Sequence, residues 1–508
     1  MTVKITSIGL KGLEGYRVEV EVHLLPDQPS MVIVGLPDAS VREAKERVLA
    51  AMHSLGNEQP SKKIIVNLSP PEQKKNGPLF DLAMVIGILK ASGIIKERIP
   101  QNIAFLGALS LDGSIRSVDG LLSVVLAAKR IGIEMVYLPE DSSIPISQIP
   151  GIRCIAVRHV KEVLQSLSGQ ELHPLTSIPS TAAIHVSSPH SKRDFRHILG
   201  HQQAKRALEI AAAGGHHVFM SGPPGCGKSL LSETFPSILP TLSDEESLEV
   251  MSIYQLAQIP GPPVRIPPFR QPHHSASYVS IVGGGASPRP GEVSLAHHGV
   301  LFLDEMGEFT KKTLDTLRQP IETGKVTISR ASGTVTYPAR FLLLGAMNPC
   351  PCGYLGSKTH YCSCTPKQLE LYRNRISGPI FDRMDIILNL QPVQLEREQI
   401  NGESSENIRE RVMKARERQY ERYGSNLTNS IVPVELLLSQ SLPANQKRML
   451  EQTASTQAWS NRVQMKVIRL ARTIADLKGE ANITDEAIWE AVTLRRVTQS
   501  QKSSRLAR

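Results

Sequence analysis

This 508-residue chain lacks the sequence features that are typical of secreted and membrane proteins. Six cysteines are too few for a framework of disulfides. The chain has no run of about 18 apolar residues that could span a membrane, and its first residues, 1–6, lack the apolar stretch of a signal peptide. We therefore expect a cytoplasmic protein that does not interact with a membrane.

Aromatic residues are also scarce, at 4% of the chain. The net charge is +10 and the isoelectric point is about 9.2, which favours a polyanionic partner such as nucleic acid. Because few aromatic rings are available to stack on bases, contacts with the phosphate backbone should dominate, and binding should weaken as salt rises. The length is sufficient for two to four domains with full-sized cores.

A complete phosphate-binding loop of the form G-x-x-x-x-G-K-[ST] occupies residues 222–229, Gly-Pro-Pro-Gly-Cys-Gly-Lys-Ser. A strand-like run at 217–220 precedes it and a helix can begin after it, so backbone N–H groups should point at a polyphosphate. Lys228 is expected on the β- and γ-phosphates, and Ser229 is expected to hold Mg²⁺. The residues predicted to contact ATP are Gly222, Pro223, Pro224, Gly225, Cys226, Gly227, Lys228, Ser229 and Leu230.

Two further strand-like runs end in polar residues that suit ATP hydrolysis. The run at 300–303 is followed by Asp304, which can join the Mg²⁺ shell, and by Glu305, which can polarise the attacking water. The run at 341–347 is followed by Asn348, whose amide can orient that water. Together with the phosphate loop, these residues predict a Mg²⁺-dependent ATPase.

Composition and periodicity divide the chain into four parts. Residues 1–166 show mixed α/β patterns, and residues 167–192 are rich in Ser, Thr, Pro and His, which indicates a linker. Strands and helices alternate over 193–400, which predicts a parallel sheet with both faces covered. The pattern is helical from 401 to 508.

Two segments of the first part resemble the catalytic segments of the Lon protease domain: 75–81, Lys-Asn-Gly-Pro-Leu-Phe-Asp, and 107–132. The resemblance implies a Lon-protease-like (ribosomal S5 domain 2-like) α/β fold. In Lon these segments carry the nucleophilic Ser and its Lys base, whereas the matching positions here are Leu79 and Leu122. Because a nucleophile needs a hydroxyl or thiol and an adjacent base, we expect this domain to lack protease activity and to serve assembly or substrate contact.

Three strings in the second half, 291–299, 346–353 and 375–385, resemble the magnesium-chelatase-like branch of AAA+ ATPases. With a Lon-like domain in front, the domain order resembles the ComM (YifB-like) proteins. This resemblance implies an AAA+ core with a C-terminal helical lid and assembly as a homo-hexamer. It also implies activity as an ATP-dependent branch-migration helicase on single-stranded and branched DNA, in homologous recombination during natural transformation.

The same resemblance implies roles for arginines. Arg383, in Phe-Asp-Arg-Met-Asp, resembles an arginine finger that completes the ATP site of a neighbouring subunit. Arg462, in Ser-Asn-Arg, resembles the sensor 2 arginine and is expected to reach the γ-phosphate of its own subunit; Arg469 and Arg472 are weaker candidates. The alternative for Arg383 and Arg462 is an ordinary surface arginine.

Residues 324–337 alternate on both sides of a small-residue turn, which predicts a β-hairpin. The segment resembles the pre-sensor hairpin that lines the central pore of related helicases, which implies that Lys325 and Arg330 contact DNA phosphates. The alternative is a plain surface hairpin with solvated charges. Residues 280–286 resemble a second pore loop, although a passive loop remains open.

Four of the six cysteines gather in one short segment, at Cys350, Cys352, Cys362 and Cys364. Four thiols in a loop of an intracellular protein suggest a Zn²⁺ site with four cysteine ligands. His360 could replace one thiol. Free thiols and redox pairing are the alternatives.

Two other functions compete with a DNA motor. The first is the ATPase motor subunit of a magnesium-chelatase-type complex that inserts a metal into a tetrapyrrole, and the Lon-like domain and positive charge disfavour it. The second is a scaffold that does not hydrolyse ATP, which the presence of Glu305 disfavours.

Overall fold

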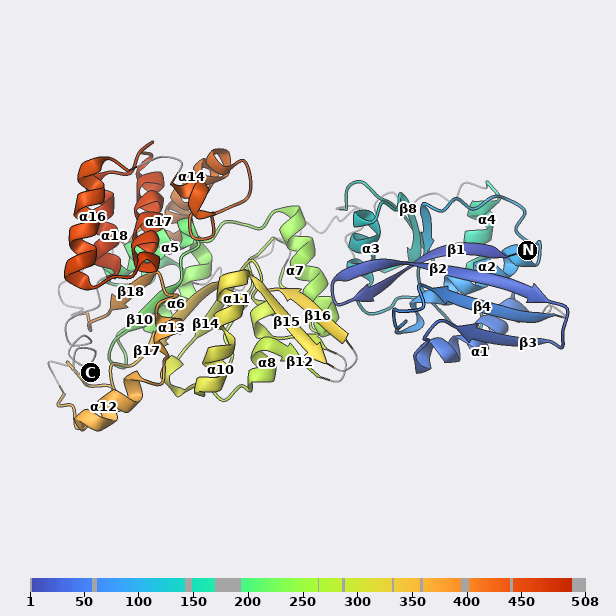
Figure 1. The fold of residues 1–508 in the computed structure, drawn as a ribbon, viewed down its shortest axis with the longest axis horizontal. Coiled ribbons are helices and arrows are strands. Elements are labelled where there is room, and N and C mark those ends of the chain that lie inside the picture. Colours follow the sequence, from blue (N-terminus) through green and yellow to red (C-terminus); the bar gives the residue numbers. More distant parts are fainter. Residues whose placement is uncertain are drawn as a thin grey trace. The chain divides into compact units, whose positions relative to one another are not determined.

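The computed structural model describes residues 2–56, 62–141, 149–169, 193–263, 265–285, 288–330, 333–356, 360–393, 402–438 and 442–495. Contacts divide the chain into two compact units (Figure 1). The first unit comprises Met1–Val186 with Leu248–Gly261 and Ser329–Thr336, and the second comprises Ser187–Ser247, Pro262–Ile328 and Tyr337–Arg508. Most of the predicted linker lies outside the described residues.

A mixed seven-stranded sheet forms the centre of the first unit, in the order β3-β4-β2-β1-β5-β8-β9. Along β2, Val18, Val20 and Val22 alternate with more exposed residues because successive side chains point to opposite faces of a sheet. The strands are β1 (Val3–Lys11), β2 (Glu14–Leu25), β3 (Ser30–Val34), β4 (Lys63–Ser69), β5 (Ile103–Phe105), β8 (Met135–Pro139) and β9 (Arg153–Val157), with a separate pair β6 (Ala108–Leu109) and β7 (Ile115–Arg116).

Helices cover this sheet, and their packing buries the positions that resemble the Lon catalytic residues. Leu79 and Leu122 are 7% and 0% exposed and belong to one apolar cluster with Ile8 and Ala104. The catalytic positions of the resembling fold are therefore part of an apolar core. The helices are α1 (Ala39–Ser54), η1 (Pro78–Phe80), α2 (Asp81–Ala91), α3 (Leu121–Arg130) and α4 (Val160–Leu167).

The second unit is built on the predicted parallel sheet, in the order β11-β14-β17-β10-β18. Because the strands are parallel, their carboxyl ends meet at one edge, where a ligand site forms in open α/β sheets. The strands are β10 (Val218–Ser221), β11 (Phe269–Arg270), β14 (Val300–Leu303), β17 (Leu342–Met347) and β18 (Ile386–Asn389).

The C-terminal region is helical, as the sequence predicts, and shares one apolar core with the sheet. Helix α5 (Gln202–Gly214) packs against both α14 and α17, and Figure 1 shows α16, α17 and α18 side by side at the red end of the chain. The C-terminal helices are α14 (Ser405–Tyr423), α15 (Val434–Leu437), α16 (Ala444–Gln457), α17 (Asn461–Lys478) and α18 (Asp485–Arg495).

The remaining helices and strands lie between those already named. They are η4 (Phe195–His197), α6 (Lys228–Thr234), η5 (Phe235–Ile238), α7 (Asp244–Ala257), α8 (Tyr278–Val282), β12 (Gly283–Gly284), β13 (Arg289–Pro290), α9 (Glu292–Leu295), η6 (Met306–Glu308), α10 (Lys311–Thr316), α11 (Arg318–Thr323), β15 (Lys325–Arg330), β16 (Gly333–Pro338), α12 (Pro366–Arg373) and α13 (Gly378–Phe381).

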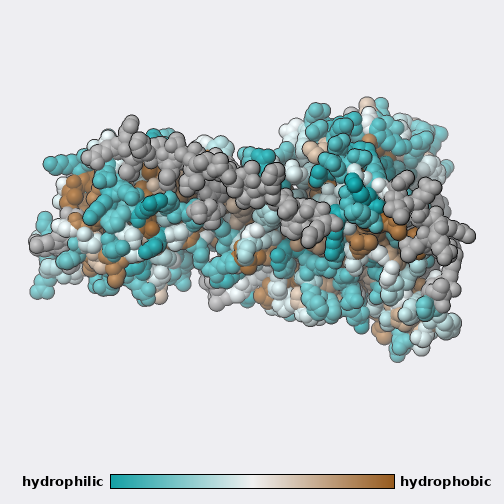
Figure 2. All heavy atoms as spheres, turned by 180° about the vertical axis from the view of Figure 1, so that it is seen from behind, coloured by the Kyte–Doolittle hydropathy of each residue, from teal (hydrophilic) through white to brown (hydrophobic). Residues whose placement is uncertain are grey.

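No helix in the described part of the chain is long and apolar enough to cross a membrane. The face drawn in Figure 2 is mostly hydrophilic, with apolar side chains in small separate groups.

Candidate active site

The phosphate loop joins the end of β10 to the start of α6. Gly225 and Gly227 have φ angles of +74° and +85°, a left-handed conformation that glycine adopts without strain. Cys226 turns its side chain into the core and is 2% exposed, so it packs as a small apolar residue. The two left-handed glycines therefore give the loop the tight turn that a phosphate-binding loop at a helix N-terminus requires.

Lys228 connects the loop to the neighbouring strand. Its ammonium group donates hydrogen bonds to the carbonyl oxygens of Gly222, at 2.7 Å, and Pro223, at 2.9 Å. It also donates to Oδ1 of Asn348, at 3.1 Å, and Asn348 directly follows β17. The structure thus brings together the two predicted residues that would contact the γ-phosphate and its attacking water.

The predicted Mg²⁺ ligands also meet. The Ser229 hydroxyl donates to Oδ2 of Asp304 at 2.9 Å, which places two oxygen ligands of the kind that Mg²⁺ prefers side by side. Glu305 follows with a φ of +48°, an unusual value for a residue with a side chain. This conformation turns the chain directly after β14, and the Glu305 N–H donates to Oδ1 of Asp304 at 2.9 Å.

His274 is a neighbour of Glu305 that sequence reasoning missed. Its Nδ1 lies 3.5 Å from Oε2 of Glu305. The contact arises because His274 follows β11, and β11 pairs in parallel with β14. The signal for it is Gln-Pro-His-His after the short strand β11, and it can be interpreted only once β11 is known to lie beside β14.

Arg383 lies in a different group of contacts. Its guanidinium forms an ion pair with Glu322 of α11 at 2.7 Å and donates to the Pro379 carbonyl oxygen at 2.6 Å. Arg462, at the start of α17, pairs with the same Glu322 carboxylate. The structure therefore places Arg383 and Arg462 together at Glu322 of α11, and Arg383 also contacts α13. Glu322 was not singled out from the sequence.

The two weaker arginine candidates have other contacts. Arg469 donates to the carbonyl oxygens of Ser430 and Val432, the latter at 2.8 Å. Arg472 is 3% exposed and pairs with Asp476 one helical turn away at 2.9 Å. Both side chains stabilise the packing of the C-terminal helices.

A buried polar cluster joins the sheet to α17. Asp385 accepts hydrogen bonds from Lys466, at 2.7 Å, and from the His217 backbone N–H, at 2.8 Å. Although burial acts to raise the pKa of Asp385, Lys466 and His216 outweigh it and hold that pKa well below its usual value. Burial lowers the pKa of His217 to about 4, and its Nδ1 accepts from the Leu343 N–H at 3.0 Å, so this imidazole is neutral at pH 7.

The predicted hairpin forms between β15 and β16. Lys325 is the first residue of β15 and Arg330 is its last, and both side chains are exposed. Five residues of extended strand span about 17 Å, and strand alternation turns the two side chains to opposite faces. The structure therefore separates the two predicted DNA contacts, with Lys325 at the base of the hairpin and Arg330 near its turn.

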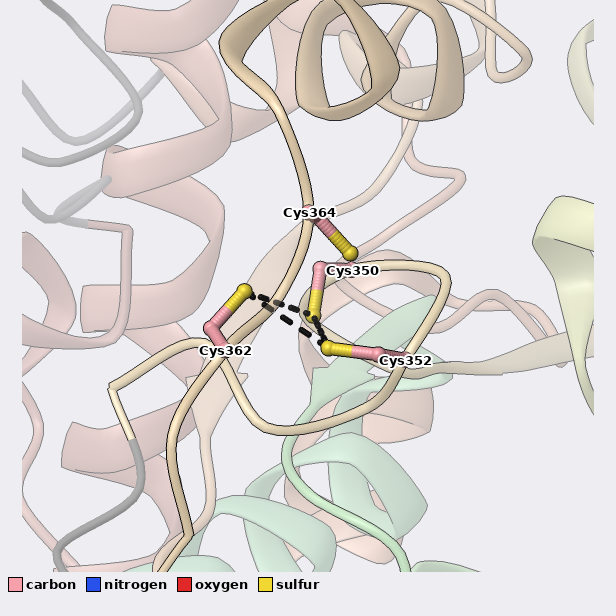
Figure 3. A group of neighbouring side chains, drawn as sticks. All are labelled: Cys350, Cys352, Cys362 and Cys364. Atoms are coloured by element: carbon pink, nitrogen blue, oxygen red, sulfur yellow. Dashed lines mark hydrogen bonds between the residues drawn. The ribbon is translucent and has the colours of Figure 1, made fainter.

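The four clustered cysteines converge on one point (Figure 3). All four Sγ atoms lie within 4.8 Å of one another, and the distances among those of Cys350, Cys352 and Cys362 are 3.3, 3.8 and 3.6 Å. Tetrahedral Zn²⁺ with Zn–S bonds of about 2.3 Å separates its sulfur ligands by about 3.8 Å. The cluster therefore fits Zn²⁺.

The thiols of the four-cysteine cluster differ in their surroundings. A backbone hydrogen bond from Tyr354 lowers the pKa of the Cys352 thiol to about 6, whereas burial raises that of Cys350 to about 12. The Leu355 N–H also donates to Sγ of Cys350 at 3.3 Å. His360, the predicted substitute ligand, stacks on the Tyr354 ring with centroids 4.7 Å apart.

These features define the class of protein. A parallel sheet whose strand ends carry a phosphate loop, an acid pair and an amide, with a helical C-terminal region, is that of an AAA+ ATPase. Residues 194–398 match the family described as magnesium chelatase, subunit ChlI, and residues 402–495 match the C-terminal part of the same subunit. Residues 20–142 match a further family described as subunit ChlI of Mg-chelatase.

Relatives match nearly the whole chain. The YifB protein of Escherichia coli (strain K12) is 39% identical over 491 residues, which cover 96% of this chain and 95% of the relative. The competence protein ComM of Haemophilus influenzae is 38% identical over 490 residues, with 95% of each chain covered. The chain belongs to the ComM/YifB-like magnesium-chelatase family.

A partial match supports the Lon-like reading of the first unit. Lon protease 2 of Bacillus subtilis is 30% identical over 165 residues, which cover 30% of this chain and 29% of the protease. The resemblance predicted from the sequence is thus confirmed at the N-terminal region, together with the parallel sheet and the helical C-terminal region.

Proposed function

We propose that this chain is an ATP-driven motor that assembles as a homo-hexamer, binds single-stranded and branched DNA, and catalyses branch migration during homologous recombination in natural transformation. The name of the Haemophilus influenzae relative, competence protein, supports the process. The net charge of +10 supports a polyanionic partner.

One observation supports the assembly of several subunits into a ring with ATP sites between them. Arg383 is held by Glu322, while Lys228, Asn348, Ser229 and Asp304 contact one another in a separate group. An arginine finger that does not contact its own phosphate loop is available to the loop of a neighbour. Arg462 shares the Glu322 carboxylate, so it is available to that same neighbouring site.

Within this proposal each residue has a defined task. Lys228 exchanges its carbonyl contacts for phosphate oxygens, and Glu305 accepts a proton from the attacking water, which Asn348 orients. Ser229 and Asp304 would hold Mg²⁺, which neutralises phosphate charge when bound. Arg383 of one subunit would stabilise the charge that develops on the γ-phosphate in the next.

We further propose that the four-cysteine cluster holds Zn²⁺. Its convergent thiols and sulfur spacing support this ion. Elemental analysis of protein purified without chelator should find about one Zn²⁺ per chain, and a content near zero would reject the site.

A second function has support of its own, because the matching families are described as a magnesium chelatase subunit. In that case the motor would act on a partner that inserts a metal into a tetrapyrrole. The full-length match to ComM and YifB proteins favours the DNA motor.

The deciding experiment measures ATP hydrolysis with no addition, with forked or branched DNA, and with a chelatase partner and porphyrin. We expect DNA alone to stimulate turnover. Stimulation only by the chelatase partner and porphyrin would overturn the proposal in favour of the second function.

A variant locates the DNA contact. Arg330→Ala should weaken DNA binding regardless of base sequence and flatten its salt dependence, while basal ATP hydrolysis persists. Arg98→Ala, which removes the same charge from an exposed position in the first unit, serves as the control. If both variants bind DNA like the wild type, the hairpin has only a structural role.

A further inference from the structure

The four-cysteine cluster is connected to the ATP site through the end of β17. The Gly222 N–H at the start of the phosphate loop donates to the Met347 carbonyl oxygen at 3.3 Å, and the next residue, Asn348, accepts from Lys228. Cys350 follows two residues later and is fully buried. Whatever fixes Cys350 therefore also restrains the strand end that contacts the phosphate loop.

A direct contact joins the cluster to the loop on a second side. A Cβ atom built on Gly353 would lie only 2.7 Å from the ring carbons of Pro224, and the φ of Gly353 is +82°. Glycine at this position lets the backbone directly after Cys352 lie against the phosphate loop. This close approach needs both a left-handed backbone and the absence of a side chain.

The other end of the cluster reaches the acidic half of the site. Cys364 leads into α12, whose Tyr372 ring atoms would lie 3.1–3.2 Å from a Cβ atom on Gly307, two residues after Glu305. Arg375, just beyond α12, donates to the Gly307 carbonyl oxygen at 2.9 Å. We call the segment that follows Cys352 and the segment that follows Cys364 the two arms of the cluster. One arm contacts the phosphate loop, and the other contacts the segment that follows Glu305.

From these contacts we infer that the four-cysteine cluster is a metal-dependent positioning element of the ATP site. A thiophilic ion such as Zn²⁺ bound there would hold the two arms together and so fix Asn348, Pro224 and the segment after Glu305 in one arrangement. Nucleotide affinity then depends on the metal, and by linkage nucleotide raises the affinity for the metal by the same factor. The inference rests on the proposed zinc site and ATP site.

The test measures two bindings on the full-length protein. One is the affinity for a fluorescent, non-hydrolysable ATP analogue before and after Zn²⁺ removal by a thiol reagent and chelator, and again after Zn²⁺ is restored. The other is the affinity for Zn²⁺, from competition with a chromogenic chelator, with and without the analogue. We expect Zn²⁺ removal to weaken the analogue about tenfold, and the analogue to strengthen Zn²⁺ binding by a similar factor.

Two glycine variants separate this role from simple folding of the loop. Gly353→Ala should retain Zn²⁺ yet bind the analogue more weakly, because the new methyl group pushes against Pro224. Gly356→Ala is the matched control, since Gly356 has a similar φ of +80° but open space around its Cβ position. It should keep wild-type affinity for the analogue.

Three outcomes distinguish failure of the zinc site, of its positioning role and of the ATP site. Absence of Zn²⁺ from the purified protein would remove the metal site and this inference with it. Zn²⁺ at about one per chain with unchanged analogue affinity after its removal would overturn this inference alone. Failure of the metal-loaded protein to bind the analogue at all would instead reject the proposed ATP site.

Discussion

The two units of this chain resemble two catalytic folds, but the positions that would carry chemistry have opposite characters. In the first unit they are Leu79 and Leu122, both buried in an apolar cluster. In the second unit Lys228, Ser229 and Asp304 are polar and take part in hydrogen bonds at the sheet edge. The matching positions of the first fold are therefore apolar and buried, whereas those of the second fold are polar and hydrogen-bonded.

The physical cost of polar groups explains the difference. A buried hydroxyl or ammonium without partners destabilises a domain, while a fully buried leucine stabilises it by about 1.5–3 kcal/mol. The burial of Leu79 and Leu122 therefore stabilises the core of the first unit, which unpaired hydroxyl or ammonium groups at these positions would destabilise. The polar group around Lys228 persists because phosphate and Mg²⁺ require it.

The largest expected effect comes from Lys228→Ala, which removes the positive charge of the phosphate loop in the second unit. ATP hydrolysis should fall below detection, and ATP affinity should drop about 100-fold, because a hydrogen-bonded charge is lost. Lys4→Ala, an exposed lysine of the first unit, is the control for the lost charge. Equal nucleotide affinity in wild type and Lys228→Ala would refute the assignment.

Glu305→Gln should block ATP hydrolysis without weakening ATP binding, unlike Lys228→Ala. The amide cannot accept a proton from water, so ATP should bind and remain unhydrolysed. Filter binding with labelled ATP, followed by analysis of the bound nucleotide, distinguishes trapped ATP from ADP. Rapid conversion to ADP would show that another residue activates the water.

The next effect concerns Arg383, whose contacts separate it from Lys228 on the same subunit. Arg383→Ala should lower turnover about 1000-fold while DNA binding persists, since arginine fingers contribute on this scale. Mixing it with Lys228→Ala protein should restore part of the activity, because some interfaces then pair an intact phosphate loop with an intact finger. Mixtures that stay inactive at every ratio would argue against a shared site.

A smaller effect should come from a change in the core of the first unit. Leu122→Ala should destabilise the first unit by about 2–5 kcal/mol through lost burial and a cavity. ATP affinity should not change, because this residue packs in a separate core. Both tryptophans, Trp459 and Trp489, belong to the second unit, so the weakened transition should appear in far-ultraviolet circular dichroism but not in tryptophan fluorescence. A shift in both signals would contradict independent cores.

Much of the fold follows from local sequence patterns. The apolar runs before Asp304 and Asn348 are strands because short, continuous apolar segments suit a sheet covered on both faces. Helix α18 lies in the region predicted to be helical, and it has acidic residues in its first turn and an arginine in its last. The predicted Ser229–Asp304 proximity holds because parallel strands deliver their ends to one edge.

The contacts that could not be predicted join distant segments. Glu322 is one of many exposed glutamates until folding places Arg383 and Arg462 beside it. His274 becomes a neighbour of Glu305 only through the pairing of β11 with β14. Sequence patterns report what each element requires, but they do not specify which side chains of separate elements meet. The cis reach expected for Arg462 rests on resemblance and stays a prediction, and the contact that the sequence did not indicate is its ion pair with Glu322.

The smallest expected effect concerns acid and His217 of the second unit. His217 has a folded-state pKa of about 4, against an ordinary value of 6.5, because burial disfavours its charged form. Above pH 6.5 both states hold the neutral imidazole and stability is complete. As pH falls from 6.5 toward 4 the unfolded chain binds the proton first, so stability is lost, by at most about 3 kcal/mol.

Urea unfolding followed by tryptophan fluorescence at pH 7 and pH 5 measures this loss in the second unit alone. His217→Asn should flatten the pH dependence, because an amide oxygen can replace Nδ1 as acceptor for the Leu343 N–H without titrating in this range. His197→Gln removes an exposed histidine of the same unit and should keep the wild-type slope. The pKa of Asp385 lies well below this window, so its ion pair with Lys466 contributes equally at both pH values. If His217→Asn and wild type lose the same stability between pH 7 and pH 5, the acid sensitivity of this unit arises elsewhere.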